Sequence, residues 1–326
     1  MSLDLDFDDG QQAIADAVNQ FCRERCPPEV AREARARGAL PLELWRELAA
    51  TGFLAAAADD GGALEAVAVL EALGRAAFPG PLPETLLASR VLLDDERAAV
   101  VEGRAIAAVG HAGSTLVPWA PVADLFLWVE RGRVFRARAT GSVEPVETLG
   151  GEPWGRVALE RGEELGAEPG VLALFDVALA ALMAAAGGQL VEDAVEHART
   201  RTQFGRPIGE FQAVAHPLAD CHMHLAASRT LVRAAAWHFD EDSAEAGVRA
   251  SAARLSARAA SLEAAHVAHQ TFGALGITLE GPVFHVSRFV RQLASRSLGD
   301  AGETVLAHFS SASRSERAEA QKGAQP

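Results

Sequence analysis

Apolar side chains recur at helical spacing through the first third of the chain. In the segment DDGQQAIADAVNQFCRERC, Ile14 and Val18 lie four positions apart, so a helix would put both on one face. In LPLELWRELAATGFL, Leu44 and Leu48 repeat this spacing, and a proline stands where the helix would begin. Prolines and glycines separate the segments. The pattern therefore predicts an N-terminal helical domain over residues 1–98.

The pattern changes after residue 98. The segments RAIAAVGHAG, DLFLWVERGRVFRARA and GRVALERG are short, punctuated by glycine and richer in valine and aromatic residues, a composition that favours strands. Arg131 and Gly132 stand between FLWVE and RVFRA, where a hairpin turn is expected. We expect a small β domain over residues 99–167.

Long helical segments, many of them rich in alanine, return over residues 168–312. They predict a four-helix bundle with a C-terminal extension, and the polar segment 313–326 is expected to be a disordered tail. The sequence thus predicts a mainly α fold: an N-terminal helical domain, a small central β domain and a C-terminal four-helix bundle. The helices of the last part are expected at residues 171–199, 211–239, 244–274, 282–297 and 302–311.

The chain of 326 residues carries a formal net charge of -14. Such a protein lacks the large basic face that binds nucleic acid or anionic membranes, so neither is expected as a partner. Its three cysteines match no disulfide framework or zinc spacing, and MSLDLDFDDGQQ has no apolar run typical of signal peptides. Asp176 and Gln189 interrupt the longest apolar segment. We expect a cytoplasmic protein with reduced thiols and no membrane span.

Histidines and a cysteine cluster in the segment AHPLADCHMHL. His216, His222 and His224 do not share the spacing of metal ligands on a helix, so no metal site is expected, and packing or hydrogen bonding is favoured. Cys221 lies inside an expected helix rather than at an electropositive helix start. It is therefore not expected to act as a nucleophile.

Two glycine-bearing loops leave alternatives open. GALGITLEG follows an expected helix, whereas a dinucleotide fingerprint follows a strand, so a Rossmann site is not expected. Gly273 and Gly276 either end that helix or let the backbone approach a ligand. RTRTQFGRPIG joins two long helices and contains Arg201 and Phe204. It is either a solvated connector or a loop that grips a planar, anionic ligand.

Two stretches together resemble the acyl-CoA dehydrogenase family in order, spacing and helical setting: ARTRTQFGRPIGEFQAVAHPLADCHMHLAASRTLVRAAAW and QTFGALGITLEGPVFHVSRFVRQLASRSLGD. The segment LWRELAATGFLAAAADDGG is similar to the family's opening domain, more loosely. The resemblance implies the same three-part fold and a FAD cofactor bound between subunits. It also implies oxidation of the α,β bond of an acyl-CoA substrate, in which a glutamate removes the α-proton while hydride leaves for the flavin.

The resemblance also implies cofactor contacts, residue by residue. In the family, the RxxFG loop, the start of the next helix and a Q..GG.G loop reach the FAD of a neighbouring subunit. The second pattern reads QTFGALG here, with an alanine in place of the usual second glycine. The matching positions are Arg201, Gln203, Phe204, Phe211, Gln212, Gln270, Gly273 and Ala274.

The positions that match the family's catalytic base carry no glutamate. The more common position, aligned from Glu280 and Pro282, falls on Ser297 or Leu298. The alternative position on the first bundle helix falls on Phe175. None of these side chains is a general base at neutral pH, so no catalytic residue is assigned.

The family's threonine-rich, glycine–serine motif, which wraps the flavin ring, is also not found in residues 100–165. A chain without the catalytic base and without this motif resembles the shorter subunit of the α2β2 acyl-CoA dehydrogenases of steroid side-chain degradation. In these enzymes the longer subunit supplies both the base and the flavin-ring pocket. We therefore expect a subunit that is inactive alone, completes the FAD site of a longer acyl-CoA dehydrogenase chain, and serves a steroid-CoA or another bulky acyl-CoA. Three alternatives stay open: a homo-oligomer with a displaced base (Asp176, Asp300 or Glu303), a flavin-free scaffold subunit, and a flavin-dependent monooxygenase of the same fold.

Overall fold

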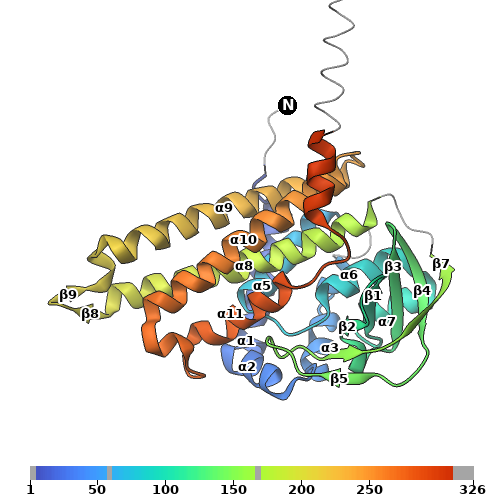
Figure 1. The fold of residues 1–326 in the computed structure, drawn as a ribbon, viewed down its shortest axis with the longest axis horizontal. Helices are drawn as coiled ribbons and strands as arrows, with labels where there is room; N and C mark the ends of the chain where they lie inside the picture. The colour runs from blue at the N-terminus through green and yellow to red at the C-terminus, as the bar shows by residue number, and fades with distance from the viewer. Residues whose placement is uncertain (1–4, 57–60, 166–169, 311–326) are drawn as a thin grey trace, which may run out of the picture.

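The computed structural model describes residues 5–56, 61–165 and 170–310. It confirms a mainly helical chain with a small sheet region (Figure 1). Of the N-terminal helices, α1 packs along α5, and α5 in turn packs on the bundle. Their bounds are α1 Asp9–Arg25, α2 Pro28–Arg37, α3 Leu42–Ala50, α4 Phe53–Ala56, α5 Ala63–Arg75, α6 Leu82–Val91 and α7 Asp94–Val101.

Neighbouring residues start and stop the first two helices. Gln11 N donates to Asp8 Oδ1 at 2.8 Å, and the Gln11 side chain accepts from Asp8 N at 3.2 Å, which is a capping box at the start of α1. Pro28 opens α2, and Gly38 closes it in the left-handed region at a φ of 60°. These ends therefore follow from local sequence.

Residues 107–164 form two small sheets. The larger has the strand order β1–β3–β4–β7, with β1 parallel to β3 and the other pairs antiparallel; the smaller has the order β2–β6–β5. The expected hairpin turn joins β3 and β4, where Arg131 and Gly132 have φ values of 50° and 77°. The strands are β1 Ala107–His111, β2 Leu116–Pro118, β3 Leu125–Glu130, β4 Arg133–Ala139, β5 Glu144–Val146, β6 Trp154–Arg156 and β7 Leu159–Glu164.

The long bundle helices lie close to the expected segments, but the fourth helix is shorter. Instead of continuing to residue 297, α11 ends at Ala294, because the chain turns at Ser295 and takes Arg296 into the interior, where it is 4% exposed. Residues 301–310 are helical again. The tail expected at 313–326 lies outside the described residues. The bundle helices are α8 Val171–Thr200, α9 Gln212–Asp240, α10 Ala246–Phe272 and α11 Pro282–Ala294.

Helix α8 is the centre of the molecule. Every side chain from Val177 to Ala186 is buried, and α5, α6, α9, α10 and α11 all pack against this helix. By length and composition α8 could cross a membrane, yet 83% of its apolar window is buried inside the protein. Helix α8 is therefore the core helix of this protein. Its alanines and glycines are small, so the neighbouring helices approach it closely.

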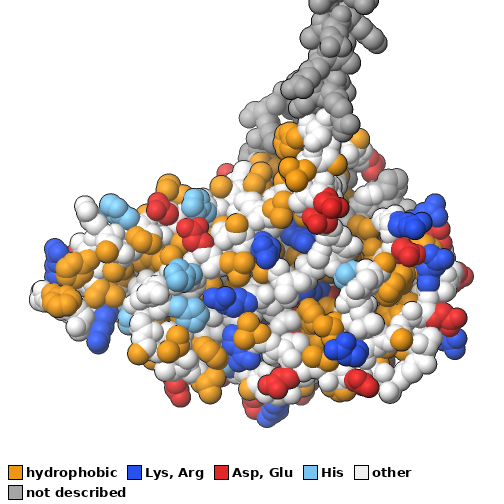
Figure 2. Space-filling model, viewed as in Figure 1, with side chains coloured by type: hydrophobic (Ala, Val, Ile, Leu, Met, Phe, Trp, Pro, Cys, Tyr) orange, Lys and Arg blue, Asp and Glu red, His pale blue; other side chains and the backbone are white. Residues whose placement is uncertain are grey.

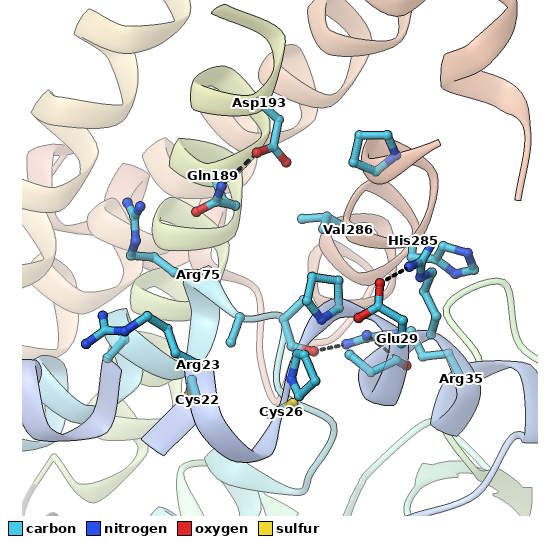
Figure 3. Close-up of a pocket in the computed structure, with 18 of the residues that line it drawn as sticks. Cys22, Arg23, Cys26, Glu29, Arg35, Arg75, Gln189, Asp193, His285 and Val286 are labelled. Atoms are coloured by element: carbon cyan, nitrogen blue, oxygen red, sulfur yellow. Dashed lines mark hydrogen bonds and ion pairs between the residues drawn. The ribbon is translucent and has the colours of Figure 1, made fainter. Parts of the chain in front are cut away.

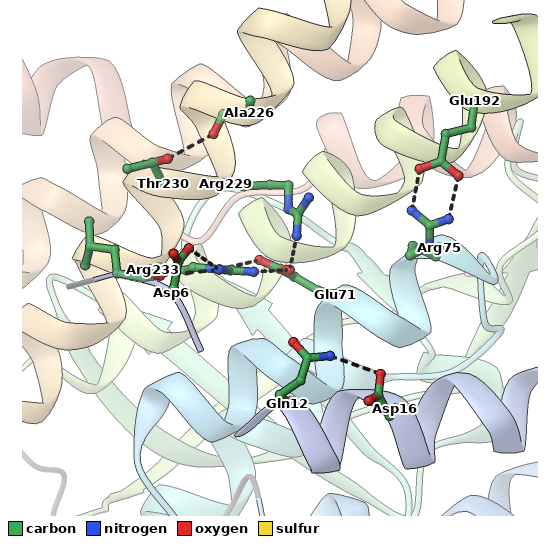
Figure 4. A network of polar contacts seen from close by, with 11 residues as sticks. Asp6, Gln12, Asp16, Glu71, Arg75, Glu192, Ala226, Arg229, Thr230 and Arg233 are labelled. Atoms are coloured by element: carbon green, nitrogen blue, oxygen red, sulfur yellow. Dashed lines mark hydrogen bonds and ion pairs between the residues drawn. The ribbon is translucent and has the colours of Figure 1, made fainter. Parts of the chain in front are cut away.

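Ion pairs fasten the N-terminal helices to the bundle. Arg229 and Arg233 of α9 converge on Glu71 of α5, each with an N–O distance of 3.0 Å (Figure 4). Arg75, one turn further along α5, pairs with Glu192 of α8 at 2.6 Å. The side chains of Glu71 and Arg233 are only 8% and 13% exposed. Removing the Glu71 carboxylate would leave the mostly buried Arg233 without its nearest carboxylate partner, which is costly.

The last residue of α9 also caps the first turn of α5. Asp240 Oδ1 accepts from Ala63 N at 2.6 Å, and its Oδ2 accepts from Leu64 N at 3.2 Å. A carboxylate suits the free N–H groups and the positive end of the helix dipole. Because Gly62, the residue before α5, has no side chain to do this, the cap comes from a residue 177 positions away.

Replacing Gly74 with alanine is expected to destabilise the protein by about 1–3 kcal/mol. The added Cβ would lie 2.8 Å from the carbonyl oxygen of Leu182 on α8. Gly188 is a matched control, because a Cβ built there meets nothing within 4 Å; Gly188→Ala should stabilise the helix by roughly 0.5–1 kcal/mol. Urea unfolding measures both changes. Stabilisation by both variants would contradict the close packing of α5 on α8.

Candidate cofactor surface and catalytic cleft

The loop between α8 and α9 forms a short hairpin at one end of the bundle, at the left in Figure 1. β8 (Thr202–Gln203) pairs with β9 (Arg206–Pro207). Phe204 and Gly205 make the turn with φ values of 53° and 81°, and such a two-residue turn requires positive values at both positions. The turn holds the Phe204 side chain 92% exposed to solvent.

Aromatic and charged side chains of this hairpin pack on one another. The guanidinium carbon of Arg206 lies 4.2 Å from the ring centroid of Phe211, and the ring of Phe204 meets that ring edge-on at 6.2 Å. Phe211 follows the short turn η2 (Ile208–Glu210) and precedes the first residue of α9. An exposed aromatic ring beside a fixed positive charge suits a flat, anionic ligand.

The loop after α10 lies at the same end of the bundle. The helix is closed by Gly273, which has a φ of 61° and donates its N–H to His269 O, and the turn η3 (Gly273–Ile277) follows. The rings of His197 on α8 and Phe272 on α10 stack with their centroids 4.2 Å apart. Burial, and next the charge of Arg201, lower the pKa of His197. A neutral ring pair therefore holds the two loops beside each other.

All eight residues that the sequence assigns to a cofactor belong to these two loops or their flanking helix ends. They present guanidinium, amide and aromatic groups outward, so the set fits part of a site for a nucleotide-like anion. Apolar and basic side chains lie at this end of the molecule in Figure 2. Phe211 is half-buried, and the exposed members are Arg201, Gln203, Phe204, Gln212, Gln270, Gly273 and Ala274.

The two positions expected for a catalytic base surround a buried ion pair. Arg296 pairs with Glu84 of α6, and their side chains are 2% and 0% exposed. The guanidinium of Arg296 lies 5.6 Å from the ring centroid of Phe175. Burial lowers the pKa of Arg296 to about 9, which leaves it charged at neutral pH. Ser297 and Leu298 line a neighbouring cavity of about 550 Å³, the cleft between the β sheet and the bundle.

The carboxylates named as displaced bases have other roles or are exposed. Asp176 accepts from Arg254 Nη1 at 2.7 Å and from Ser251 Oγ at 3.3 Å. Asp300 accepts from the backbone N–H of Glu303 at 3.0 Å and so caps the last described helix. The Glu303 residue itself is exposed. Asp176 is thus held behind the wall of the cleft by an arginine.

The three cysteines are free and buried, as expected for reduced thiols. Cys22 and Cys26 line a second cavity of about 620 Å³ between the N-terminal helices and the bundle (Figure 3). Burial raises the pKa of Cys22 to about 12 and that of Cys26 to about 11. It likewise raises the pKa of Cys221 to about 11. Protonated thiols are poor nucleophiles, so their environment does not favour covalent chemistry.

Histidines of α9 lie on its outer side. His216 and His222 are exposed, and His224 Nδ1 lies 2.8 Å from Glu263 Oε2 on α10; histidines are visible on the bundle surface in Figure 2. A packing role is therefore wrong for His216 and His222, which fall on the solvent side of the helix. Within the described residues, no group of three or more His, Cys, Asp or Glu side chains is placed to hold a metal ion.

Three charged residues of the cleft were missed by reasoning from the sequence. Glu84 and Arg296 are 212 positions apart, and Arg254 stands 78 positions after Asp176. No local motif connects such pairs. A weak hint was the single acidic residue in the otherwise mostly apolar segment LPETLLASRV, since a charge on a buried face needs a partner.

Comparisons with known proteins agree with this geometry. The family model described as acyl-CoA dehydrogenase, N-terminal domain, matches residues 8–92, and the C-terminal domain model matches residues 172–303. Acyl-CoA dehydrogenase IpdE2 of Mycobacterium tuberculosis is 33% identical over 288 residues, which cover 83% of this chain and 87% of that protein. The chain therefore belongs to the acyl-CoA dehydrogenase family of oxidoreductases.

Solved structures have the same fold. The ChsE4–ChsE5 complex from Mycobacterium tuberculosis contains a chain with a TM-score of 0.81 and 26% identity, and the match covers 99% of this chain and 100% of that one. Butyryl-CoA dehydrogenase from Megasphaera elsdenii has a TM-score of 0.77 and 19% identity, with 93% and 98% covered. The similarity to butyryl-CoA dehydrogenase shows only that the fold is shared.

Replacing Asp176 with alanine should destabilise the protein by about 3–5 kcal/mol, because it leaves the Arg254 charge without its carboxylate. Arg254 is only 8% exposed. The double variant Asp176→Leu with Arg254→Met removes both charges and should recover most of the loss. Denaturant unfolding measures these changes, and Glu303→Ala, at an exposed residue, is the control. A variant Asp176→Asn that keeps its stability but abolishes turnover would instead identify Asp176 as a base.

Proposed function

We propose that this chain is a subunit of a FAD-dependent acyl-CoA dehydrogenase that has no catalytic base and completes the FAD site of a longer partner chain. The observation that carries the proposal is which residues occupy the base positions in and beside the cleft. Phe175, Ser297 and Leu298 stand at the base positions, and the Arg296–Glu84 ion pair lies beside them. A proton acceptor must lie within hydrogen-bonding reach of the proton it removes, and these positions offer none.

The position of the cofactor loops supports a site shared between chains. Phe175 and Arg201 lie at opposite ends of α8, which spans Val171–Thr200. At about 1.5 Å of rise per residue, they are roughly 40 Å apart. Helix α8 is enclosed by other helices, so it does not bend to bring its two ends together. A loop this far from its own cleft is positioned to serve the cleft of another chain.

On this proposal the outward-facing residues hold the part of FAD that lies between the chains. Arg201 would form charge-assisted hydrogen bonds to phosphate, Phe204 would stack on a flat ring, and Gly273 would let the backbone approach closely. Bound FAD supplies the acceptor for hydride, while the longer chain would supply the base and the flavin-ring pocket. The remaining members of the set are Gln203, Phe211, Gln212, Gln270 and Ala274.

The relatives support a heteromer and suggest a substrate class. The ChsE4–ChsE5 structure is described as a complex of two differently named proteins, and one of its chains matches this chain over its full length. A structure described as a steroid ACAD shares the fold, with a TM-score of 0.81 and 23% identity. We therefore propose a steroid-CoA or another bulky acyl-CoA as substrate. The free thiols suit a cytoplasmic location.

Expressed alone, the chain is expected to retain no stoichiometric FAD and to oxidise no acyl-CoA. Co-expressed with a longer acyl-CoA dehydrogenase chain, it should form a flavin-containing complex with fewer flavins than chains. Flavin absorbance, protein mass and dehydrogenation of several acyl-CoA thioesters measure this. Full flavin content with turnover by the single chain would overturn the proposal. A stable complex without flavin would support a scaffold role.

In the assembled complex, Phe204→Ala is expected to weaken FAD retention by roughly tenfold, because it removes a stacking ring. The unfolding midpoint of the free chain should hardly change, since Phe204 is 92% exposed. Leu93→Ala is the matched control: Leu93 is also exposed, at 74%, but lies in the N-terminal region. Flavin release on dilution or gel filtration measures retention. Equal retention in both variants would place the FAD elsewhere.

A further inference from the structure

The cleft without a base is lined by positive charge. Its cavity of about 550 Å³ lies between the β3–β4 turn, α10 and residues 294–302, and Arg131, Arg254, Arg258 and Arg296 are among its lining residues. The chain as a whole has a net charge of -14. Four arginines therefore lie around one cavity of a protein whose net charge is negative.

The acidic residues near the cavity offset only part of this charge. Glu130 forms an ion pair with Arg161, and Asp300 caps the helix that follows it. Arg254 and Arg296 have carboxylate partners, Asp176 and Glu84, which do not themselves line the cavity. These pairs fix two guanidinium groups in place, so the wall is rigid before any ligand arrives.

Two further arginines have no carboxylate partner within the described part of the chain, namely Arg131 and Arg258. Arg258 Nε donates to Ala294 O at 3.0 Å, which orients the guanidinium and uses one of its five N–H groups. Arg296 is 4% exposed, and its Nε and Nη1 have no hydrogen-bond partner in the structure. Those two atoms are themselves buried, so the guanidinium groups that a ligand in the cavity can meet are those of the exposed Arg131 and Arg258.

We propose that this cleft binds a small molecule through a carboxylate or phosphate group, held by Arg131 and Arg258. Guanidinium groups bind both anions through paired hydrogen bonds, and the cavity volume falls within the range of small-molecule sites. The inference rests on the proposed function, because a cleft that contained flavin and acyl-CoA would have no room for this ligand. In this subunit, the cleft where a catalytic site is expected would then bind an anion.

Calorimetric titration of the full-length chain, alone and in its complex, tests the proposal with pyrophosphate, ADP and succinate as probes. At least one probe should bind saturably with a dissociation constant of about 1 mM or tighter. Binding of pyrophosphate and ADP but not succinate would indicate a phosphorylated ligand, and the reverse a carboxylated one. The double variant Arg131→Ala with Arg258→Ala should weaken binding at least about tenfold. Both residues are exposed, so the variant is expected to fold.

Arg37→Ala is the control, because Arg37 is an exposed arginine of α2 that pairs with Glu33 and should not affect binding. If no probe binds, or if Arg37→Ala weakens binding as much as the double variant, the anion site is wrong. Flavin content of the same complex separates the two proposals. A flavin on every chain would reject the proposed function and the premise of this site, whereas fewer flavins than chains with no anion binding would reject the anion site alone.

Discussion

The burial of α8 is the constraint on which the rest of this structure depends. Helices from the N-terminal region and from the bundle all use it as their common core, and small side chains permit this close approach. Gly74 of α5, for example, leaves no room for a Cβ beside Leu182. A straight, enclosed helix also separates its two ends permanently. Phe175 near one end packs beside Arg296, while Arg201 follows the other end and begins the loop with the candidate cofactor residues. On the proposed function, this separation divides the site between two chains.

On the proposed function, ion pairs stand beside the cleft where a catalytic base would be expected. A base needs an accessible carboxylate, but the carboxylates here, Glu84 and Asp176, are held by Arg296 and Arg254. Buried ion pairs add little net stability because desolvation offsets their attraction. They are nevertheless costly to break, and so they determine which segments meet. In this protein they bind α6 to the segment after α11, and α8 to α10.

The end of the bundle that carries the β8–β9 hairpin exposes its side chains to solvent, whereas the cleft at the other end lies beside buried ion pairs. The ring of Phe204 is exposed to water, with 92% of the residue accessible. The backbone of a two-residue turn, the stacking of His197 on Phe272 and the contact of Arg206 with Phe211 hold this end in shape. A surface held in shape in this way suits the proposed role of supplying the outer part of a shared cofactor site.

Much of this architecture is determined by sequence patterns that act over short distances. Helical periodicity predicts α8, α9 and α10, and the turn residues Arg131 and Gly132 predict a hairpin, because these signals depend on neighbouring residues. The loop motifs likewise indicate the family and the candidate cofactor residues. The early end of α11 was not predictable, since it depends on Arg296 turning inward toward Glu84, 212 positions away. The arginine-lined cleft and the outward face of the cofactor loops were decided only by tertiary structure, because burial and pairing depend on which distant segments pack together.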